Sequence, residues 1–222
     1  TLSRSVARKS RHRDAVWGLL YDPARFAGMQ VVMQALIGGA SLVASDPRLP
    51  FYDQVAAFVQ HQVSALSATP TWWRKLLMTP GALGLPLRQI TLGGEIADNR
   101  TLCALKSTYP AAHVVHIYAS TEAGVGFAVH DGFAGFPAQW LGDGSGEVQV
   151  RVSAQSTLML KPRVRGQHYF HAEQPLFEDN GWLDTGDLVE QAGDRILFRG
   201  RANGSINVGG NKVMPEEVEQ CI

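Results

Sequence analysis

The feature that most constrains the fold is a regular alternation of short apolar runs and longer helix-like segments between Ala15 and Tyr118. The helix-like segments place apolar residues three and four positions apart, whereas the apolar runs are short and typical of buried strands. Strands that alternate with helices of this length indicate a parallel sheet with helices on both faces. The expected strands are Ala15–Leu20, Ala40–Ala44, Val63–Ala68, Gln89–Leu92 and Val114–Tyr118, and the expected helices are Phe26–Ile37, Asp53 (as the cap) to Val59, Pro70–Leu77, and Asp98 or Asn99 (as the cap) to Tyr109.

A different pattern begins near Val125. Short segments there alternate polar and apolar residues or run apolar, and Gly and Ser separate them, which is typical of antiparallel β structure. The fold class expected for the whole chain is therefore α/β, with a parallel sheet flanked by helices and a small antiparallel β-rich subdomain after it. The segments concerned are Glu147–Val152, Thr157–Lys161, Arg195–Phe198 and Ile206–Val208.

Composition excludes several classes of protein. A chain with 45% hydrophobic and 18% charged residues is not disordered. Apolar stretches such as Met29–Ala40 contain Gln and Gly and are shorter than the roughly 20 residues of a membrane span. The formal net charge of zero gives no reason to expect a nucleic acid partner. Because two cysteines, Cys103 and Cys221, form no disulfide framework and no apolar leader opens the chain, a cytoplasmic location is expected.

The loop Tyr118–Gly124 directly follows the last expected strand of the parallel sheet. Ligands of such sheets bind at the carboxyl ends of the strands. Thr121 and Glu122 stand side by side there, and a hydroxyl and a carboxylate can bind a phosphate oxygen and a divalent cation. The other interpretation is a helix cap, with Ser120 or Thr121 as the N-cap residue, and spacing alone favours it.

Two later loops also carry more polar residues than folding requires. In Gly181–Leu188, Asp187 follows Thr-Gly and could accept hydrogen bonds from a vicinal diol such as a ribose, or it could belong to an ordinary β-turn. In Phe198–Gly204, continued by Ile206–Pro215, paired glycines indicate either a close backbone approach to a ligand or a hairpin loop. None of the three loops is a glycine-rich phosphate loop of the Walker or GxGxxG type.

In their order along the chain, these segments resemble those of the AMP-forming adenylating enzymes, which include acyl- and aryl-CoA synthetases, adenylation domains of nonribosomal peptide synthetases, and luciferases. That family has Tyr-Gly-x-Thr-Glu, Thr-Gly-Asp, a Gly-Arg-x-Asp hinge and a Lys-x-x-Gly loop, preceded by Phe-Asp and Gly-Gly-Glu segments. The matching segments here are Tyr118–Glu122, Thr185–Asp187, Gly200–Asn203 and Asn207–Gly210, preceded by Tyr21–Phe26 and Gly93–Glu95.

The resemblance implies an adenylate site. Tyr118 would stack on adenine, Thr121 would bond the α-phosphate, and Glu122 would hold Mg²⁺. Asp187 would accept both ribose hydroxyls, assisted by Arg201. Thr121 and Glu122 are therefore the expected catalytic residues, with Glu122 as the metal ligand. The remaining residues expected to bind the cofactor are Gly93, Gly94, Glu95, Ile117, Ala119 and Ser120, with the Gly93–Glu95 backbone along the base or the acyl group.

Other positions would serve the acid and the thiol. Asn203 falls at the hinge about which the family's small C-terminal domain turns, and Gly209 and Gly210 match the loop beside the thiol acceptor. His116 could touch the acyl group or serve as a structural histidine. The expected acyl pocket consists of Phe26, Ala27, Gly28, His116, Val125 and Gly126.

The resemblance implies an ATP-dependent carboxylic acid ligase. Such an enzyme forms an acyl-AMP with release of pyrophosphate and transfers the acyl group to a thiol, so its cofactors are ATP/AMP, Mg²⁺, and CoA or phosphopantetheine. Its partners are a small-molecule carboxylic acid and CoA or an acyl carrier protein. A non-catalytic adenylate-binding or carrier-interacting module of the same fold is the alternative. A Rossmann-type oxidoreductase or methyltransferase is disfavoured, because no glycine-rich turn follows the first strand.

The sequence departs from the family at several positions. Asn203 stands where the family has an acid, and Asn207 replaces the common Lys. The family's phosphate loop ending in Pro-Lys and its C-terminal catalytic Lys do not occur in these 222 residues. We therefore expect a central fragment of a larger synthetase with little activity by itself. The expected domains are 1–135 (α/β, adenylate and acyl sites), 136–202 (β-rich and barrel-like, ribose loop) and 203–222 (hinge and start of the C-terminal domain).

Overall fold

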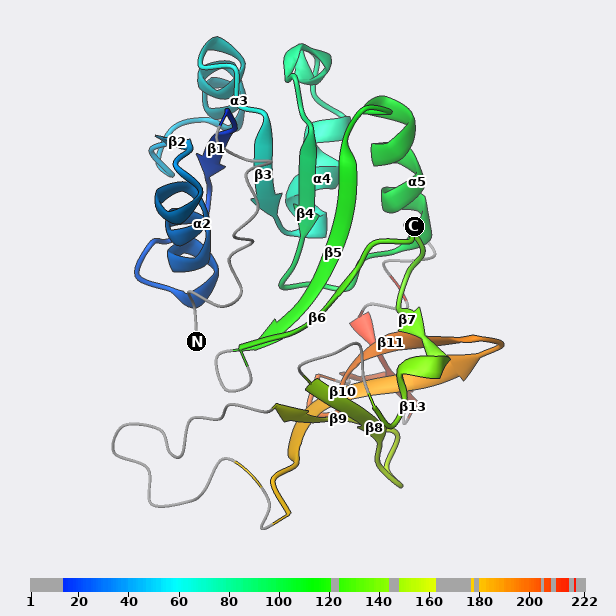
Figure 1. Cartoon of the computed structure of the whole chain (residues 1–222). Coiled ribbons are helices and arrows are strands. Elements are labelled where there is room, and N and C mark those ends of the chain that lie inside the picture. Colours follow the sequence, from blue (N-terminus) through cyan, green and yellow to red (C-terminus); the bar gives the residue numbers. More distant parts are fainter. Residues whose placement is uncertain are drawn as a thin grey trace. The chain divides into compact units, whose positions relative to one another are not determined.

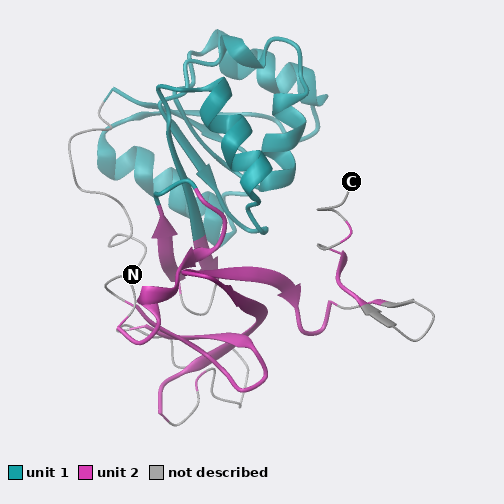
Figure 2. Cartoon of the chain, turned by 90° about the vertical axis from the view of Figure 1, so that its right-hand side faces the viewer, with its two compact units in different colours: residues 1–117, 130–132 teal, residues 118–129, 133–222 magenta. Residues whose placement is uncertain are grey.

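The computed structural model describes residues 14–120, 124–143, 148–162, 177, 180–204, 206–208, 211–215 and 218. The chain divides into two compact units (Figure 2). The first unit comprises residues 1–117 and 130–132, and the second comprises residues 118–129 and 133–222. The boundary between residues 117 and 118 falls inside one strand, and each unit is described by itself below.

The first sheet confirms the predicted parallel arrangement (Figure 1). Its strand order is β2-β1-β3-β4-β5-β6, and the pairs β1/β2, β1/β3, β3/β4 and β4/β5 are parallel. In register, Ala65 lies beside Gln89, and Gln89 lies beside His113. The strands are β1 (Val16–Leu19), β2 (Ser41–Ala44), β3 (Ala65–Ala68), β4 (Gln89–Leu92), β5 (His113–Ser120) and β6 (Gly124–Val129).

Helices cover both faces of the parallel strands, as predicted. Successive residues of a strand point to opposite faces. Ala65 of β3 packs in a cluster with Val31 of α2, while its neighbour Leu66 packs with Phe58 of α3 and Trp73 of α4. One face is therefore covered by α2 and the other by α3, α4 and α5. The helices are α2 (Phe26–Gly38), α3 (Phe51–Gln60), α4 (Pro70–Leu77) and α5 (Asn99–Thr108), with a short 3-10 helix η2 (Ala82–Gly84).

Two of these helices, α4 and α5, begin at a side-chain cap, whereas α2 and α3 do not. The Thr69 side chain accepts a hydrogen bond from the Trp72 backbone N–H at the start of α4. Asp98 does the same for the N–H of Thr101 at 2.7 Å, which confirms one of the two predicted caps of α5. The predicted cap at Asp53 is wrong: α3 begins earlier, after Pro50, and Asp53 lies in its first turn, where a negative charge also favours a helix.

The prediction of a helix cap after β5 is also wrong. β5 continues to Ser120, and the chain resumes at Gly124 as strand β6 rather than as a helix. A capping hydroxyl and an acid in the first turn are the same residue types as a polar ligand loop, so spacing alone could not separate the two. Tyr118, Ala119 and Ser120 therefore belong to β5, and Gly124 begins β6.

The second unit contains the predicted antiparallel subdomain, a five-stranded sheet in the order β7-β11-β10-β9-β8. Its core is built from both β6 and this sheet, with Phe127, Val150, Leu158, Leu160 and Ile196 buried together. β12 (Ile206–Val208) pairs antiparallel with β13 (Asn211–Val213), which confirms the hairpin interpretation for the Ile206–Pro215 part of the third polar loop. The other elements are β7 (Phe136–Pro137), the 3-10 helix η3 (Ala138–Trp140), β8 (Val148–Val152), β9 (Thr157–Pro162), β10 (Leu183–Ala192) and β11 (Arg195–Arg201).

Within the described ranges, no helix is both long and apolar enough to pass through a lipid bilayer.

The first turn of α2 lies against the backbone before it, and Gly28 makes this approach possible. A Cβ atom at position 28 would lie 2.1 Å from the carbonyl oxygen of Asp22. We expect Gly28→Ala to lower the free energy of unfolding by about 2 kcal/mol, since either α2 or the Asp22 turn must move. Urea unfolding followed by circular dichroism measures this. In Gly84→Ala, the control, the new methyl meets only the flexible Val59 side chain at 3.3 Å, and a loss as large in the control would contradict the interpretation.

Candidate functional site

The Gly93–Glu95 loop at the carboxyl end of β4 is held by close backbone packing in the first unit. The Gly93 N–H donates to the Ala68 carbonyl at the end of β3, at 3.2 Å. A Cβ at position 93 would lie 3.0 Å from the Ile117 Cγ1 atom, and Gly94 has a positive φ of 83°. The local structure therefore favours glycine at both positions, at Gly93 through close approach and at Gly94 through conformation. The predicted site residues Gly93, Gly94 and Ile117 are thus brought together.

The Glu95 side chain has a defined partner on the neighbouring loop. Its Oε2 atom accepts the backbone N–H of Thr71, in the first turn of α4, at 2.9 Å. A carboxylate in this position satisfies a helix N–H that has no partner within the helix. Beside it, the Arg74 guanidinium contacts both the Thr71 hydroxyl and the Asp98 carboxylate. The loop after β4 is therefore attached through Glu95 to the start of α4.

Tyr21, which was not among the predicted site residues, joins the same loop. Its hydroxyl donates to the Gly93 carbonyl oxygen at 3.4 Å. The sequence did contain a signal for this role of Tyr21. Tyr21 stands where the family's Phe-Asp segment has Phe, and it carries a hydroxyl that Phe lacks.

In the second unit, Asp187 lies on a distorted part of β10. The pairing of β10 with β9 shifts register between Asp184 and Leu188, and Gly186 has a φ of 69°. Asp184 makes the turn, because its Oδ1 atom accepts the Gly186 N–H at 2.9 Å. The side-chain bond to the backbone that the turn interpretation expected of Asp187 is therefore made by Asp184, and the Asp187 carboxylate makes other contacts.

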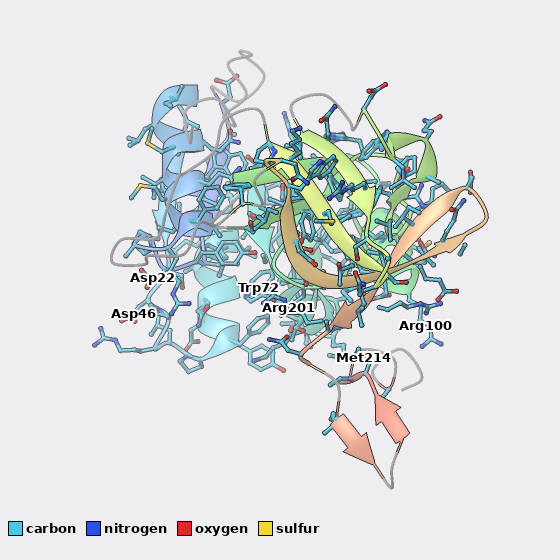
Figure 3. The ribbon with its side chains drawn as sticks, turned by 90° about the horizontal axis from the view of Figure 1, so that it is seen from below. Asp22, Asp46, Trp72, Arg100, Arg201 and Met214 are labelled. Carbon is cyan, nitrogen blue, oxygen red and sulfur yellow. The ribbon has the colours of Figure 1, made fainter. Side chains whose placement is uncertain are left out.

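Two donors hold the Asp187 carboxylate. Nε of Arg201, labelled in Figure 3 at the end of β11, donates to Oδ1 at 2.9 Å. The Tyr118 hydroxyl donates to Oδ2. The Asp187 side chain is 17% exposed and that of Arg201 64% exposed, so the pair lies at the surface with its acid partly covered. Asp187, Arg201 and Tyr118 were all predicted to bind the adenylate, and the structure brings them together.

Tyr118 is surrounded by aromatic rings. Its ring lies nearly parallel to those of Phe127 and Phe198, with centroids 5.3 and 5.2 Å away. Burial raises the pKa of the Tyr118 hydroxyl well above its ordinary value, and the negative charge of Asp187 and the hydrogen bond to it raise it further. The phenol is therefore a hydrogen-bond donor at neutral pH. Stacking of Tyr118 on adenine stays a prediction.

The other predicted pocket residues lie on three elements. Phe26 and Ala27 are half-buried at the start of α2, and Gly28 is buried behind them. His116, on β5 beside Leu92 of β4, is 8% exposed. Half-buried Val125 and buried Gly126 belong to β6, and a Cβ at position 126 would lie 3.1 Å from the Tyr118 Cδ1 atom.

The remaining predicted site residues lie at the end of β5, in a turn, or outside the described residues. Ala119 and Ser120 are half-buried at the end of β5. Asn203 is exposed in the turn after β11. Thr121, Glu122, Gly209 and Gly210 lie outside the described residues.

The site residues thus form two groups, one in each unit. The first comprises the Gly93–Glu95 loop with Ile117 and Tyr21, and the second comprises Tyr118, Gly126, Asp187 and Arg201. Ile117 and Tyr118 are consecutive residues of β5, so this strand contributes to both groups. Chemically, the first group presents backbone groups in a fixed loop, and the second presents an oriented carboxylate with a neighbouring guanidinium. Such a carboxylate accepts hydrogen bonds from hydroxyl groups.

Known proteins are similar to this chain over most of its length. Surfactin synthase subunit 2 of Bacillus subtilis is 24% identical over 234 residues, covering 90% of this chain and 6% of that protein. The chloroplastic/peroxisomal 2-succinylbenzoate–CoA ligase of Arabidopsis thaliana is 26% identical over 239 residues, covering 88% of this chain and 41% of that protein. The chain thus spans less than half the length of either relative.

The fold is also found in solved structures. The O-succinylbenzoate coenzyme A synthetase of Bacillus subtilis, in complex with ATP and magnesium ion, has a TM-score of 0.67 at 23% identity, over 94% of this chain and 46% of that chain. The predicted fold class, that of the large domain of adenylate-forming enzymes, is therefore confirmed. The family model described as AMP-binding enzyme matches residues 2–162, well over half of the sequence. The chain belongs to the AMP-binding enzyme family.

Proposed function

We propose that this chain supplies the adenylate-binding part of an ATP-dependent ligase. The enzyme activates a small carboxylic acid as acyl-AMP, releases pyrophosphate, and passes the acyl group to the thiol of CoA or of carrier-protein phosphopantetheine. The observation that carries the proposal is the Asp187 carboxylate, which lies on the distorted part of β10 and is oriented by Arg201 and Tyr118. The chain's membership of the AMP-binding enzyme family supports it. A cytoplasmic location would suit these substrates.

Asp187 has the chemistry that a ribose requires. A vicinal diol presents two O–H donors on adjacent carbons, and a carboxylate presents two acceptor oxygens that can receive both. Each oxygen also keeps a further lone pair when Arg201 and Tyr118 are in place. Arg201 and Tyr118 limit the rotation of the acid before the nucleotide arrives, which lowers the entropic cost of binding.

Thr121 and Glu122 are assigned to the phosphates by their position after β5 and by the resemblance. Attack of the substrate carboxylate on the α-phosphorus places negative charge on the phosphoryl oxygens, and the Thr121 hydroxyl can donate to one of them. Glu122 offers the carboxylate oxygens that Mg²⁺ prefers, and the bound ion would neutralise charge on the same oxygens. The acyl-adenylate formed is then attacked by a thiol, so none of these side chains has to act as a nucleophile.

Phe26, Ala27, Gly28, His116, Val125 and Gly126 keep the acyl-pocket role that the resemblance implies. The hinge at Asn203 and the thiol loop at Gly209 and Gly210 likewise keep the roles that the resemblance implies. Asn203 and Asn207 replace the family's acid and Lys, which favours a second candidate, an adenylate-binding module without turnover.

ATP–pyrophosphate exchange, measured across a panel of carboxylic acids on a polypeptide that carries this chain, separates the ligase from the module without turnover. Exchange with at least one acid is expected, and its absence with every acid supports the module instead.

The ribose assignment predicts that Asp187→Ala weakens AMP binding to this chain at least about 10-fold, because hydrogen bonds to a charged group are worth roughly 1.5–3 kcal/mol. Isothermal titration calorimetry measures the Kd. Asp194→Ala is the matched control, since Asp194 is exposed in the turn between β10 and β11. An unchanged Kd in the folded Asp187 variant means that the ribose binds elsewhere.

The metal assignment predicts that Glu122→Gln raises the Mg²⁺ concentration needed for half-maximal ATP–pyrophosphate exchange by about 10-fold or more, since one carboxylate ligand is lost. AMP binding without Mg²⁺ should stay within about twofold of the unsubstituted chain, because the ribose contacts remain. A Mg²⁺ requirement that does not change would remove Glu122 from the metal site.

A further inference from the structure

The Tyr21 hydroxyl lies where two strands and one loop of the first unit meet. Tyr21 lies two residues after β1, is half-buried, and donates to the Gly93 carbonyl oxygen at 3.4 Å. The side chain of Ser67, a buried residue of β3, also acts on the pKa of this hydroxyl. The Tyr21 side chain therefore connects the segment after β1 to the loop after β4.

This hydroxyl acts on a loop that is restrained at each of its three residues. The Gly93 N–H is bonded to the Ala68 carbonyl, Gly94 is in the left-handed region with φ 83°, and the Glu95 carboxylate is bonded to the Thr71 N–H. Tyr21 supplies a restraint on a further group, the Gly93 carbonyl. That carbonyl and the N–H of Gly94 belong to one rigid peptide plane and point in opposite directions. Holding the carbonyl therefore also fixes the direction of the Gly94 N–H.

The hydroxyl keeps its proton under all ordinary conditions. Burial raises the pKa of Tyr21 to about 12, and the negative charge of the nearby Glu95 also raises it, against the opposing effect of the Ser67 hydrogen bond. A phenol that stays protonated is a permanent donor to Gly93. Phe, the residue of the corresponding family segment, has the same ring and cannot make this bond.

We propose that Tyr21 is a positioning residue for the adenylate site: its hydroxyl orients the Gly93–Gly94 peptide and so sets how tightly the loop holds the base of the nucleotide. This inference rests on the proposed function, because it takes the Gly93–Glu95 loop as part of the adenylate site. Tyr21 itself need not touch the ligand.

Tyr21→Phe tests the proposal, because it removes one oxygen atom and keeps the ring. Tyr52→Phe is the matched control: Tyr52 is on α3 in the same unit and is 61% exposed. Loss of a neutral hydrogen bond predicts a rise of about 3- to 10-fold in the Kd for AMP in Tyr21→Phe, with none in Tyr52→Phe. The ¹⁵N–¹H spectrum of the labelled chain adds a local readout, the shift of the Gly94 amide and its rate of hydrogen exchange.

The outcomes separate the two proposals. If the Gly94 amide shifts and exchanges at least about threefold faster in Tyr21→Phe alone, with amides of β6 unchanged, Tyr21 positions the loop. If AMP also binds more weakly, the loop serves the nucleotide, as proposed. If the unsubstituted chain does not bind AMP, the proposed function fails while the Gly94 signal still decides the positioning role. If Tyr21→Phe leaves both the Gly94 amide and the AMP affinity unchanged, the inference is wrong.

Discussion

Parallel hydrogen bonding among β1, β3, β4 and β5 is the constraint on which the first unit depends. It requires a crossover between successive strands, so α3, α4 and α5 lie against one face and α2 against the other. It also places the carboxyl ends of these strands along one edge. The Gly93–Glu95 loop at that edge is held by its neighbours through N–H and C=O contacts. Close packing at position 93 and a positive φ at position 94 both favour glycine there.

In the second unit, an irregularity in the antiparallel sheet positions the Asp187 side chain. The register shift in β10 occurs where Asp184 turns the backbone, and Asp187 follows it with both carboxylate oxygens engaged. The parallel rings of Tyr118, Phe127 and Phe198 fix the phenol that reaches the acid. The packing of these rings is therefore coupled to the orientation of the Asp187 carboxylate, and a substitution in the ring cluster would change that orientation.

Most of the fold could be predicted because its signals are local. Apolar runs with Gly or Pro between them located the parallel strands and their helices, and the capping chemistry of Asp98 located the start of α5. The prediction was wrong where one composition suits two structures, as at Ser120, whose hydroxyl suits a helix cap and a strand end equally. Contacts between distant segments could not be predicted, because they depend on tertiary structure. Examples are the contact of Tyr21 with Gly93, 72 residues apart, and that of Tyr118 with Asp187, 69 residues apart. The order of the polar loops could locate the family but not these partners.

The two restraints on Asp187 differ in how they respond to the solvent. Arg201 is largely exposed, and an exposed ion pair contributes at most about 1 kcal/mol and is screened by dissolved salt. Tyr118 is half-buried among aromatic rings, and its hydroxyl carries no net charge, so dissolved salt screens its hydrogen bond less than it screens the ion pair. As ionic strength rises, the carboxylate therefore loses its guanidinium restraint first and keeps its phenol. A cell with concentrated electrolytes would leave this acid oriented by one partner instead of two.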